Sequence, residues 1–207
     1  MINQNTKRLL LATSNEGKIK EYKEIFKQLG LAIQLISLAD LKIKEKVEED
    51  GKTFKENAIK KAKFYYNLTK IPTLADDGGI EIDYLNGEPG IKSRRWPGYE
   101  ASDEELIELT LKKLKGVPWE KRGAQLRVVI AITLNGETLY TFEGVLRGYI
   151  VESKEKAGKL IPGYPFRSLF YLPEQEVVLG ELPFKDEVKL GHRMKALKGA
   201  LAILKNL

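Results

Sequence analysis

Residues 9–18 read LLLATSNEGK, and this stretch decides how the chain begins to fold. Its first four residues form an apolar run typical of a short buried strand, and apolar residues then recur at helical spacing from Ile19 to Leu29. Between the two lie the polar side chains of Thr13, Ser14, Asn15 and Lys18. A helix that begins directly after such a turn points its free N–H groups and its positive dipole at the turn. The sequence therefore predicts a strand–turn–helix unit that suits an anion.

The polar turn also has a simpler interpretation. Thr, Ser and Asn are the residues that most often cap helix N-termini, so capping alone explains residues 13–15. The turn is not a Walker A loop, because Ala12 stands where that motif needs its first Gly and Ile19 follows Lys18. The residue types by themselves leave phosphate binding and simple capping both open.

The rest of the chain alternates between strand and helix patterns. Further strands are predicted over residues 33–38, 72–75, 80–83 and 169–171. Helices are predicted over residues 53–66 and 102–115, each opened by a capping box, and a last helix carries Met194, Leu197, Leu201 and Leu204. Residues 128–146 are typical of a β-hairpin, in which Asn135-Gly136 favours a type I′ turn. No repeat or linker interrupts the pattern, so we expect one domain, residues 1–207, of the α/β class.

The composition excludes several kinds of site. The chain has no Cys and one His among 207 residues, which excludes disulfides, thiolate metal sites and a His-rich zinc site. A bound metal would be held by oxygen, which favours Mg²⁺ or Mn²⁺. No apolar stretch approaches ~20 residues and the N-terminal apolar run is too short for a signal peptide, so we expect a cytoplasmic protein without a membrane partner. The net charge of +6 suits anionic ligands, although solvated Lys-rich helix faces would give the same charge.

Adjacent carboxylates form the next candidate site. Residues 76–79 read DDGG, and two neighbouring Asp side chains repel each other unless a cation or a shared proton offsets the repulsion. A metal ligand and a general base are both natural uses of Asp77. The alternative is an Asp-Gly turn exposed to water.

Two further segments carry charged side chains. Glu48 and Glu49 precede the capping box at Thr53, where they would supply a metal ligand or belong to a solvated loop. His192 and Arg193 open the last helix, where they suit an anion or the edge of a base, although a lone surface His is commoner. Neither segment decides a function alone.

Taken together, these motifs resemble the inosine triphosphate pyrophosphatase family, whose members hydrolyse non-standard purine triphosphates. The resemblance runs from residue 9 to about residue 204 and rests on ordered segments at residues 12–18, 48–62, 75–83, 85–95 and 192–197. It implies an elongated two-lobed α/β fold with a mixed twisted sheet, a central cleft and flanking helices, usually in a homodimer. It also implies Mg²⁺-dependent cleavage of a nucleoside triphosphate between its α- and β-phosphates.

The resemblance assigns roles to individual residues. Asp77 would be the general base and would share the metal with Glu48 or Glu49. Thr13, Ser14, Asn15 and Lys18 would hold the triphosphate. The other positions implied to contact substrate are Gly78, Tyr164, Phe166, Arg167, His192 and Arg193.

The chain departs from the family pattern at several positions. Gly78 stands where the family usually has Ser, and Gly191 replaces the Ser before the His-Arg pair. The family's Phe-Gly-Tyr-Asp segment aligns with residues 164–167, which read YPFR, so Tyr164 keeps an aromatic ring to stack on a base while Arg167 replaces an acid. Glu187 replaces a Lys five residues before the His-Arg pair. The departures gather at the base-recognition end, so hydrolysis is better supported than the identity of the base.

Three functional hypotheses follow. The first is a pyrophosphatase for ITP, dITP or XTP. The second is a pyrophosphatase with a changed nucleotide preference, which Arg167 and Glu187 would cause. The third is a non-catalytic protein that binds nucleotides or RNA through its positive charge. No RNP-like or recognition-helix motif supports the third, so nucleic acid is not an expected partner.

Overall fold

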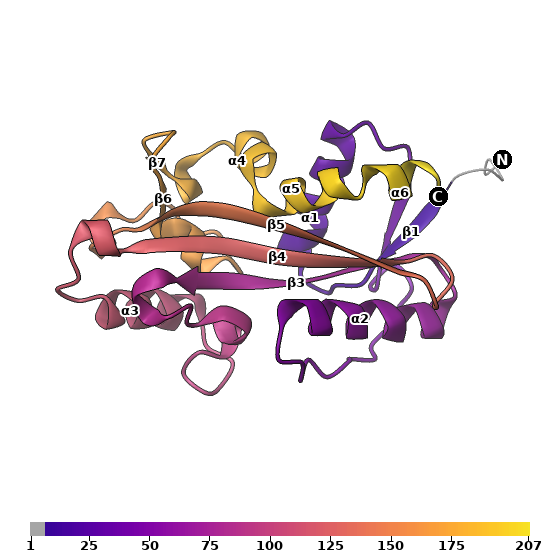
Figure 1. Cartoon of the computed structure of the whole chain (residues 1–207), viewed down its shortest axis with the longest axis horizontal. Helices are drawn as coiled ribbons and strands as arrows, with labels where there is room; N and C mark the ends of the chain where they lie inside the picture. Colours follow the sequence, from indigo (N-terminus) through magenta and orange to yellow (C-terminus); the bar gives the residue numbers. More distant parts are fainter. Residues whose placement is uncertain (1–6) are drawn as a thin grey trace. The chain divides into compact units, whose positions relative to one another are not determined.

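The computed structural model describes residues 7–207, whose strands form one seven-stranded sheet in the order β2-β1-β3-β4-β5-β6-β7 (Figure 1). The strands are β1 (Arg8–Leu11), β2 (Gln34–Ser37), β3 (Thr73–Ile82), β4 (Gly123–Thr133), β5 (Leu139–Ile150), β6 (Phe170–Leu172) and β7 (Val177–Val178). β1 pairs parallel with β2 and β3, whereas β6 pairs antiparallel with β5 and β7. This mixed sheet, flanked by helices, confirms the predicted α/β class.

Three helices begin close to their predicted N-caps, at Asn15, Thr53 and Ser102, whereas the helix over Phe184–Leu190 was not predicted. They are α1 (Glu16–Gln28), α2 (Phe54–Thr69), α3 (Asp103–Lys113), α4 (Phe184–Leu190), α5 (His192–Gly199) and α6 (Leu201–Lys205). Ser102 and Glu105 form the complete capping box of α3. At α2, Thr53 caps the N–H of Glu56 while the Glu56 carboxylate accepts from Lys52 N at 2.7 Å. None of the helices in residues 7–207 is long and apolar enough to cross a membrane.

The described residues divide into two compact units. Unit 1 comprises the chain up to Asp77 with Val128–Gly144 and His192–Leu207, and unit 2 comprises Gly78–Arg127 with Val145–Gly191. Each unit draws on separate stretches of sequence because β3, β4 and β5 each contribute to both. The single domain expected over residues 1–207 stays a prediction.

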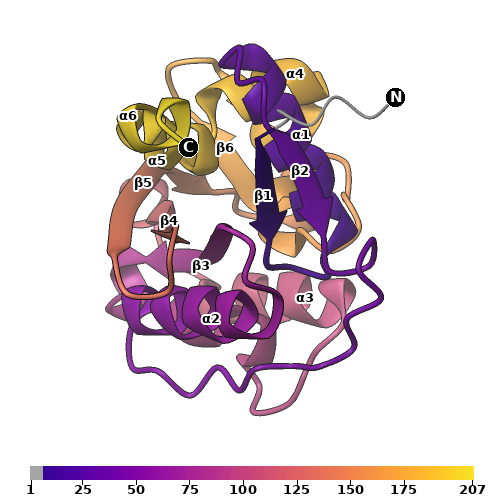
Figure 2. The ribbon, with the colours of Figure 1, turned by 90° about the vertical axis from the view of Figure 1, so that its right-hand side faces the viewer.

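In unit 1, α2 covers one face of the strands, and α5 and α6 lie over the other face (Figures 1 and 2). The core beneath α2 joins Phe54, Ala58, Ala62 and Tyr65 of the helix to Leu10, Ala75, Val129 and Ala131 of the strands. Full burial of a large apolar side chain contributes about 1.5–3 kcal/mol, so this face anchors α2 firmly. On the other face, a Cβ atom on Gly144 would lie 1.9 Å from His192 O, so only Gly lets β5 approach the start of α5 this closely.

Unit 2 has its own apolar core, and Arg122 is a buried cation beside it. The core includes Ile80, Ile82, Leu106, Leu126, Ile150, Leu169 and Phe170. Arg122 is 2% exposed and donates to four backbone carbonyls, those of Leu114, Val117, Ile150 and Val151. These carbonyls lie at the C-terminal end of α3, in the turn after it and at the end of β5. The Arg122 side chain therefore supplies hydrogen bonds to carbonyls at the ends of these elements.

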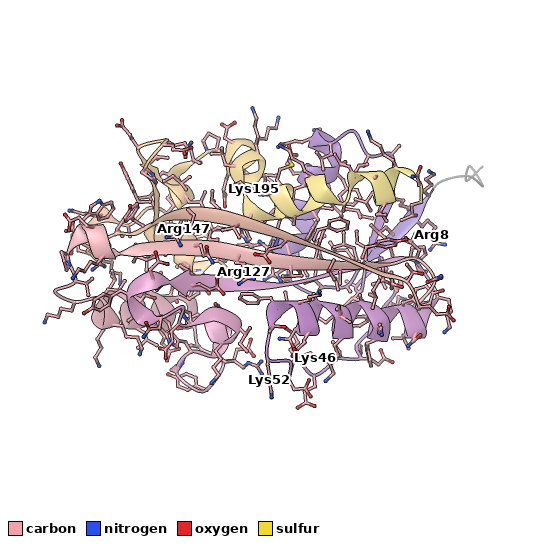
Figure 3. The ribbon with its side chains drawn as sticks, in the orientation of Figure 1. Arg8, Lys46, Lys52, Arg127, Arg147 and Lys195 are labelled. Atoms are coloured by element: carbon pink, nitrogen blue, oxygen red, sulfur yellow. The ribbon has the colours of Figure 1, made fainter. Side chains whose placement is uncertain are left out.

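Unit 2 also carries charged side chains near its surface. Figure 3 labels Arg127 and Arg147, on the strands β4 and β5. Arg147 Nη1 donates to Asp83 Oδ1 at 3.0 Å, and the two side chains are 55% and 51% exposed. Exposed pairs of this kind contribute little to stability.

Two local predictions are wrong. A type I′ turn needs a positive φ at both central residues, but only Gly136 has one, at +85°, and Asn135 does not. The Asn135 side chain instead accepts from Glu137 N and Thr138 N, at 3.1 and 2.8 Å, and so widens the loop. The last helix is also divided, because Ala200 separates α5 from α6.

Candidate active site

The turn between β1 and α1 caps the helix as the simpler interpretation predicts. Asn15 is the N-cap of α1, and its side-chain oxygen accepts from Lys18 N at 3.0 Å. Thr13 Oγ1 accepts from Asn15 N at 3.2 Å, whereas Ser14 is exposed. Capping fixes the turn and does not remove the helix dipole, so a phosphate role for these residues stays a prediction.

Lys18 is drawn inward by the first of the two adjacent carboxylates. Its Nζ lies 3.0 Å from Asp76 Oδ1, and the Lys18 side chain is 17% exposed. Burial lowers the pKa of Lys18, because desolvation outweighs the attraction of Asp76. An ammonium that is partly stripped of water and stands at a helix N-terminus is well suited to a phosphate oxygen.

Asp76 is the centre of a buried ionic network in unit 1. Besides Lys18, it accepts from Arg193 Nε at 2.9 Å, and Arg193 Nη1 lies 3.2 Å from Glu21 Oε2. Burial by itself would raise the pKa of Asp76, but Lys18, Arg193 and Lys61 together hold it well below its usual range. Asp76 therefore stays ionised and acts as an anchor for two cations.

Asp77 lies in a different environment although it is the next residue. The structure places both Asp residues inside β3, so the prediction that they end a strand and the alternative of an exposed turn are wrong. Successive side chains of a strand point to opposite faces, which separates the two carboxylates. Asp77 Oδ2 accepts from Asn57 Nδ2 of α2 at 2.9 Å, and its side chain is 12% exposed.

The surroundings of Asp77 favour its protonated form more than water does. Burial raises the pKa of Asp77, and Lys61, Lys18 and the hydrogen bond from Asn57 oppose that shift only in part. Lys61 Nζ lies 3.9 Å from Asp77 Oδ1. A carboxylate with a raised pKa is a better proton acceptor than an ordinary one, which suits a general base.

Lys61 also connects Asp77 to the acidic segment before α2. Its Nζ lies 3.2 Å from Glu49 Oε2, and the Glu49 side chain is 39% exposed. Asn57 fastens the same segment, because its Oδ1 accepts from Gly51 N at 2.8 Å. Glu48 is exposed. Of the two glutamates, Glu49 is the one that Lys61 links to Asp77.

The carboxylates do not form a closed cage. Within residues 7–207, no group of three or more His, Cys, Asp or Glu side chains is placed to hold a metal ion. Mg²⁺, however, commonly takes only one or two carboxylates and completes its shell with water and substrate phosphates. Glu49 and Asp77, on either side of an ammonium that balances their charge, fit that requirement.

His192 and Arg193 are buried, at 5% and 4% exposure, so the surface-His interpretation is wrong. Arg193 Nη1 lies 3.3 Å from His192 Nε2. The sequence indicated this pair but did not indicate Glu21, which pairs with Arg193, or Asn57 and Lys61, which contact Asp77. It also gave no sign that Asp76 anchors Lys18 and Arg193. A faint signal exists for Glu21, which follows Lys18 by one helical turn on the apolar side of α1.

The remaining predicted residues belong to unit 2. Tyr164 is half-buried, and Phe166 and Arg167 are buried in the 3₁₀ helix η5 (Pro165–Leu169). Gly78 is half-buried in β3, and beside it a Cβ atom on Gly79 would lie 2.2 Å from Ser93 Oγ. The glycine pair thus permits a close approach of backbone within the strand. Contact of these residues with a substrate stays a prediction.

Solved structures place the chain in a known class of mixed α/β proteins. The Ham1 protein of Coxiella burnetii superposes with a TM-score of 0.83 at 32% identity, covering 98% of this chain and 100% of that one. The Ham1 protein of Staphylococcus aureus gives a TM-score of 0.81 at 33% identity, with 97% and 99% covered.

Sequence comparison agrees with the structures. The model of the Ham1 family matches residues 9–203, and the chain belongs to this family. It is 42% identical to a dITP/XTP pyrophosphatase of Geobacter sulfurreducens, with 92% of each chain covered. It is 38% identical to a dITP/XTP pyrophosphatase of Bacillus subtilis, with 93% of this chain and 94% of the relative covered. The resemblance deduced from the ordered motifs is confirmed.

Proposed function

We propose that this protein hydrolyses non-standard purine nucleoside triphosphates, ITP, dITP and XTP, to the monophosphate and pyrophosphate. The observation that carries the proposal is the contrast between two neighbouring aspartates of β3. Asp76 binds Lys18 and Arg193. Asp77 is buried beside Asn57, and its pKa is raised. The names of relatives that match over nine-tenths of the chain support the same reaction.

The phosphate end of the substrate is assigned to the start of α1. Thr13, Ser14 and Asn15 lead into the first turn of α1, and Lys18 adds an ammonium. An anion there gains from the helix dipole and from charge-assisted hydrogen bonds. A bound phosphate would compete with Asp76 for Lys18, so the buried ion pair holds the lysine extended until substrate arrives.

A divalent metal, Mg²⁺ or Mn²⁺, would be held by Asp77 and Glu49. When bound, it supplies neutralisation of phosphate charge and lowers the pKa of water. Asp77 orients the attacking water in line with the bond between the α- and β-phosphates and accepts its proton. Asn57 fixes the carboxylate during this transfer, because its amide already donates to Asp77 Oδ2.

The choice between the two glutamates gives a direct prediction. Glu49→Gln is expected to lower kcat/KM about tenfold or more and to raise the Mg²⁺ concentration needed for half-maximal activity, since loss of a group at a metal site has effects of this size. Glu48→Gln, one residue away and exposed, is the matched control and is expected to change both by less than about threefold. A larger loss in the Glu48 variant would assign the metal to Glu48.

A substrate panel tests the proposed reaction. Purified protein with Mg²⁺ is given ITP, dITP, XTP, ATP, GTP, CTP and UTP, and released pyrophosphate is measured. We expect kcat/KM for ITP, dITP or XTP to exceed that for ATP and GTP by about 100-fold or more, because a polar pocket rejects a wrongly placed hydrogen-bonding group strongly. If no triphosphate yields pyrophosphate, the proposal fails.

The panel also tests a changed preference. The departures at Arg167 and Glu187 favour that second function, and equal or faster turnover of GTP or of a pyrimidine triphosphate would establish it. The proposal includes a homodimer, which the family resemblance supports, and a cytoplasmic location. Size-exclusion chromatography with light scattering measures the oligomeric state, and fractionation of the producing cells measures the location.

A further inference from the structure

Two departures from the family pattern meet inside unit 2. The pattern places an acid at position 167 and a lysine at position 187, whereas this chain has Arg167 and Glu187. In the structure, Arg167 Nη1 donates to Glu187 Oε1, and the two side chains are 6% and 4% exposed. A buried charge without its opposite partner is strongly disfavoured. Either departure alone would bury two like charges together. The two departures therefore form one exchange of charge between positions 167 and 187.

The backbone around Arg167 is fixed on both sides. Gly158 N donates to Ser168 O at 2.8 Å, and Val151 N donates to Leu169 O at 2.9 Å. Ser168 Oγ donates to Pro165 O at 2.7 Å within the same 3₁₀ helix η5. Glu187 approaches from α4, a separate element. These bonds hold η5 in place, and the Arg167 guanidinium pairs with the Glu187 carboxylate of α4.

The same guanidinium lies against an aromatic ring. The Cζ atom of Arg167 is 3.7 Å from the ring centroid of Tyr164, which caps the start of η5 and is half-buried. A guanidinium over the face of a ring is attracted by the ring's negative π face, more strongly where water is excluded. Glu187 thus forms an ion pair with Arg167, and the Arg167 guanidinium packs against one face of the Tyr164 ring.

We propose that Arg167 and Glu187 act as one positioning pair that holds Tyr164 in place to stack on the base of the substrate. The inference rests on the proposed function and on the family resemblance, which implies that Tyr164 stacks on the base. The pair acts through the tyrosine: Glu187 orients the guanidinium, and the guanidinium restricts the ring. Their effect should appear in binding of the base and leave the reacting phosphates unaffected.

The first test removes both charges together. The double variant Arg167→Met/Glu187→Met keeps similar volume and leaves no unpaired buried charge, so it is expected to fold. KM for ITP should rise about tenfold, the size of a lost base–aromatic stack, with kcat changed less than about twofold. Tyr164→Ala should give the same rise, and its addition to the double variant should give little more, because the three residues act in series.

Two controls separate this role from a general structural one. Inhibition by inorganic tripolyphosphate, which has no base, should be unchanged in the double variant. Arg147→Met, which breaks the exposed pair with Asp83, should alter neither KM nor that inhibition. An active wild type with an unchanged KM in the double variant overturns this inference alone, as does an equal loss of tripolyphosphate binding. A wild type that releases no pyrophosphate overturns the proposed function and this inference with it.

The second test concerns the coupling. Arg167→Asp and Glu187→Lys should each lower the urea midpoint, because each buries two like charges together. The charge-swapped variant Arg167→Asp/Glu187→Lys restores an opposite pair and should recover most of the lost stability. If the charge-swapped variant is no more stable than the less stable of the two single variants, the two departures are independent.

Discussion

Asp77→Asn is expected to lower kcat for pyrophosphate release about a thousandfold or more, the effect of removing a general base together with a metal ligand. Asn keeps the shape of the side chain, and its oxygen can still accept from Asn57 Nδ2, which now donates to Asp77 at 2.9 Å. The loss should therefore arise without unfolding. Steady-state kinetics and a urea titration of the same preparation measure the two effects separately.

Asp76→Asn is the matched control, because it makes the same chemical change one residue earlier. Asp76 is 1% exposed and binds both Lys18 and Arg193, so its neutralisation leaves two buried cations short of an acceptor. We expect this variant to lose about 3–5 kcal/mol of unfolding free energy, whereas Asp77→Asn should lose about 1 kcal/mol or less. Activity within a few-fold of wild type in the Asp77 variant would remove that residue from the role of base.

The second large effect concerns the stability of unit 2. Arg122→Met keeps most of the side-chain volume but withdraws donors from four carbonyls, the shortest of these bonds being 2.7 Å to Leu114 O and Val151 O. Buried acceptors left unsatisfied cost about 1–3 kcal/mol each, so the free energy of unfolding should fall by about 3 kcal/mol or more. Burial lowers the pKa of Arg122, and the nearby charge of Glu152 opposes that shift only in part.

Arg147→Met serves as its control, since this arginine lies in the same unit and its side chain is 55% exposed. Its loss should change the free energy of unfolding by about 1 kcal/mol or less. Thermal or urea denaturation of the two variants gives the comparison. Equal stability of both variants would mean that the carbonyls around position 122 find other donors.

The sequence predicted those parts of the fold that depend on neighbours along the chain. The turn into α1, the N-caps of α2 and α3 and the hairpin of β4 and β5 each rest on local spacing or capping. The sheet order was not predictable, because strand pairing joins distant segments. β3 was predicted as two short strands since DDGG resembles a turn, but Gly79 is there to let Ser93 approach.

The site was predicted in a similarly uneven way. Asp77 and Lys18 were found from residue type and motif, and the buried state of Arg193 was not. Its bond to Asp76 spans 117 positions of sequence, and no local pattern indicates it. Likewise, the reversed charges at Arg167 and Glu187 looked like two separate departures until the structure showed them paired.

The ion pair between Asp76 and Arg193 also affects when the chain becomes able to bind a nucleotide during its synthesis. Lys18 and Asp76 emerge from the ribosome early, but the cation that completes their network is residue 193 of 207. Until then Asp76 lacks the partner that α5 supplies. A chain arrested before that point would carry the whole first motif and still lack a finished phosphate site. Nascent chains of increasing length should therefore acquire nucleotide binding abruptly, near the end of translation.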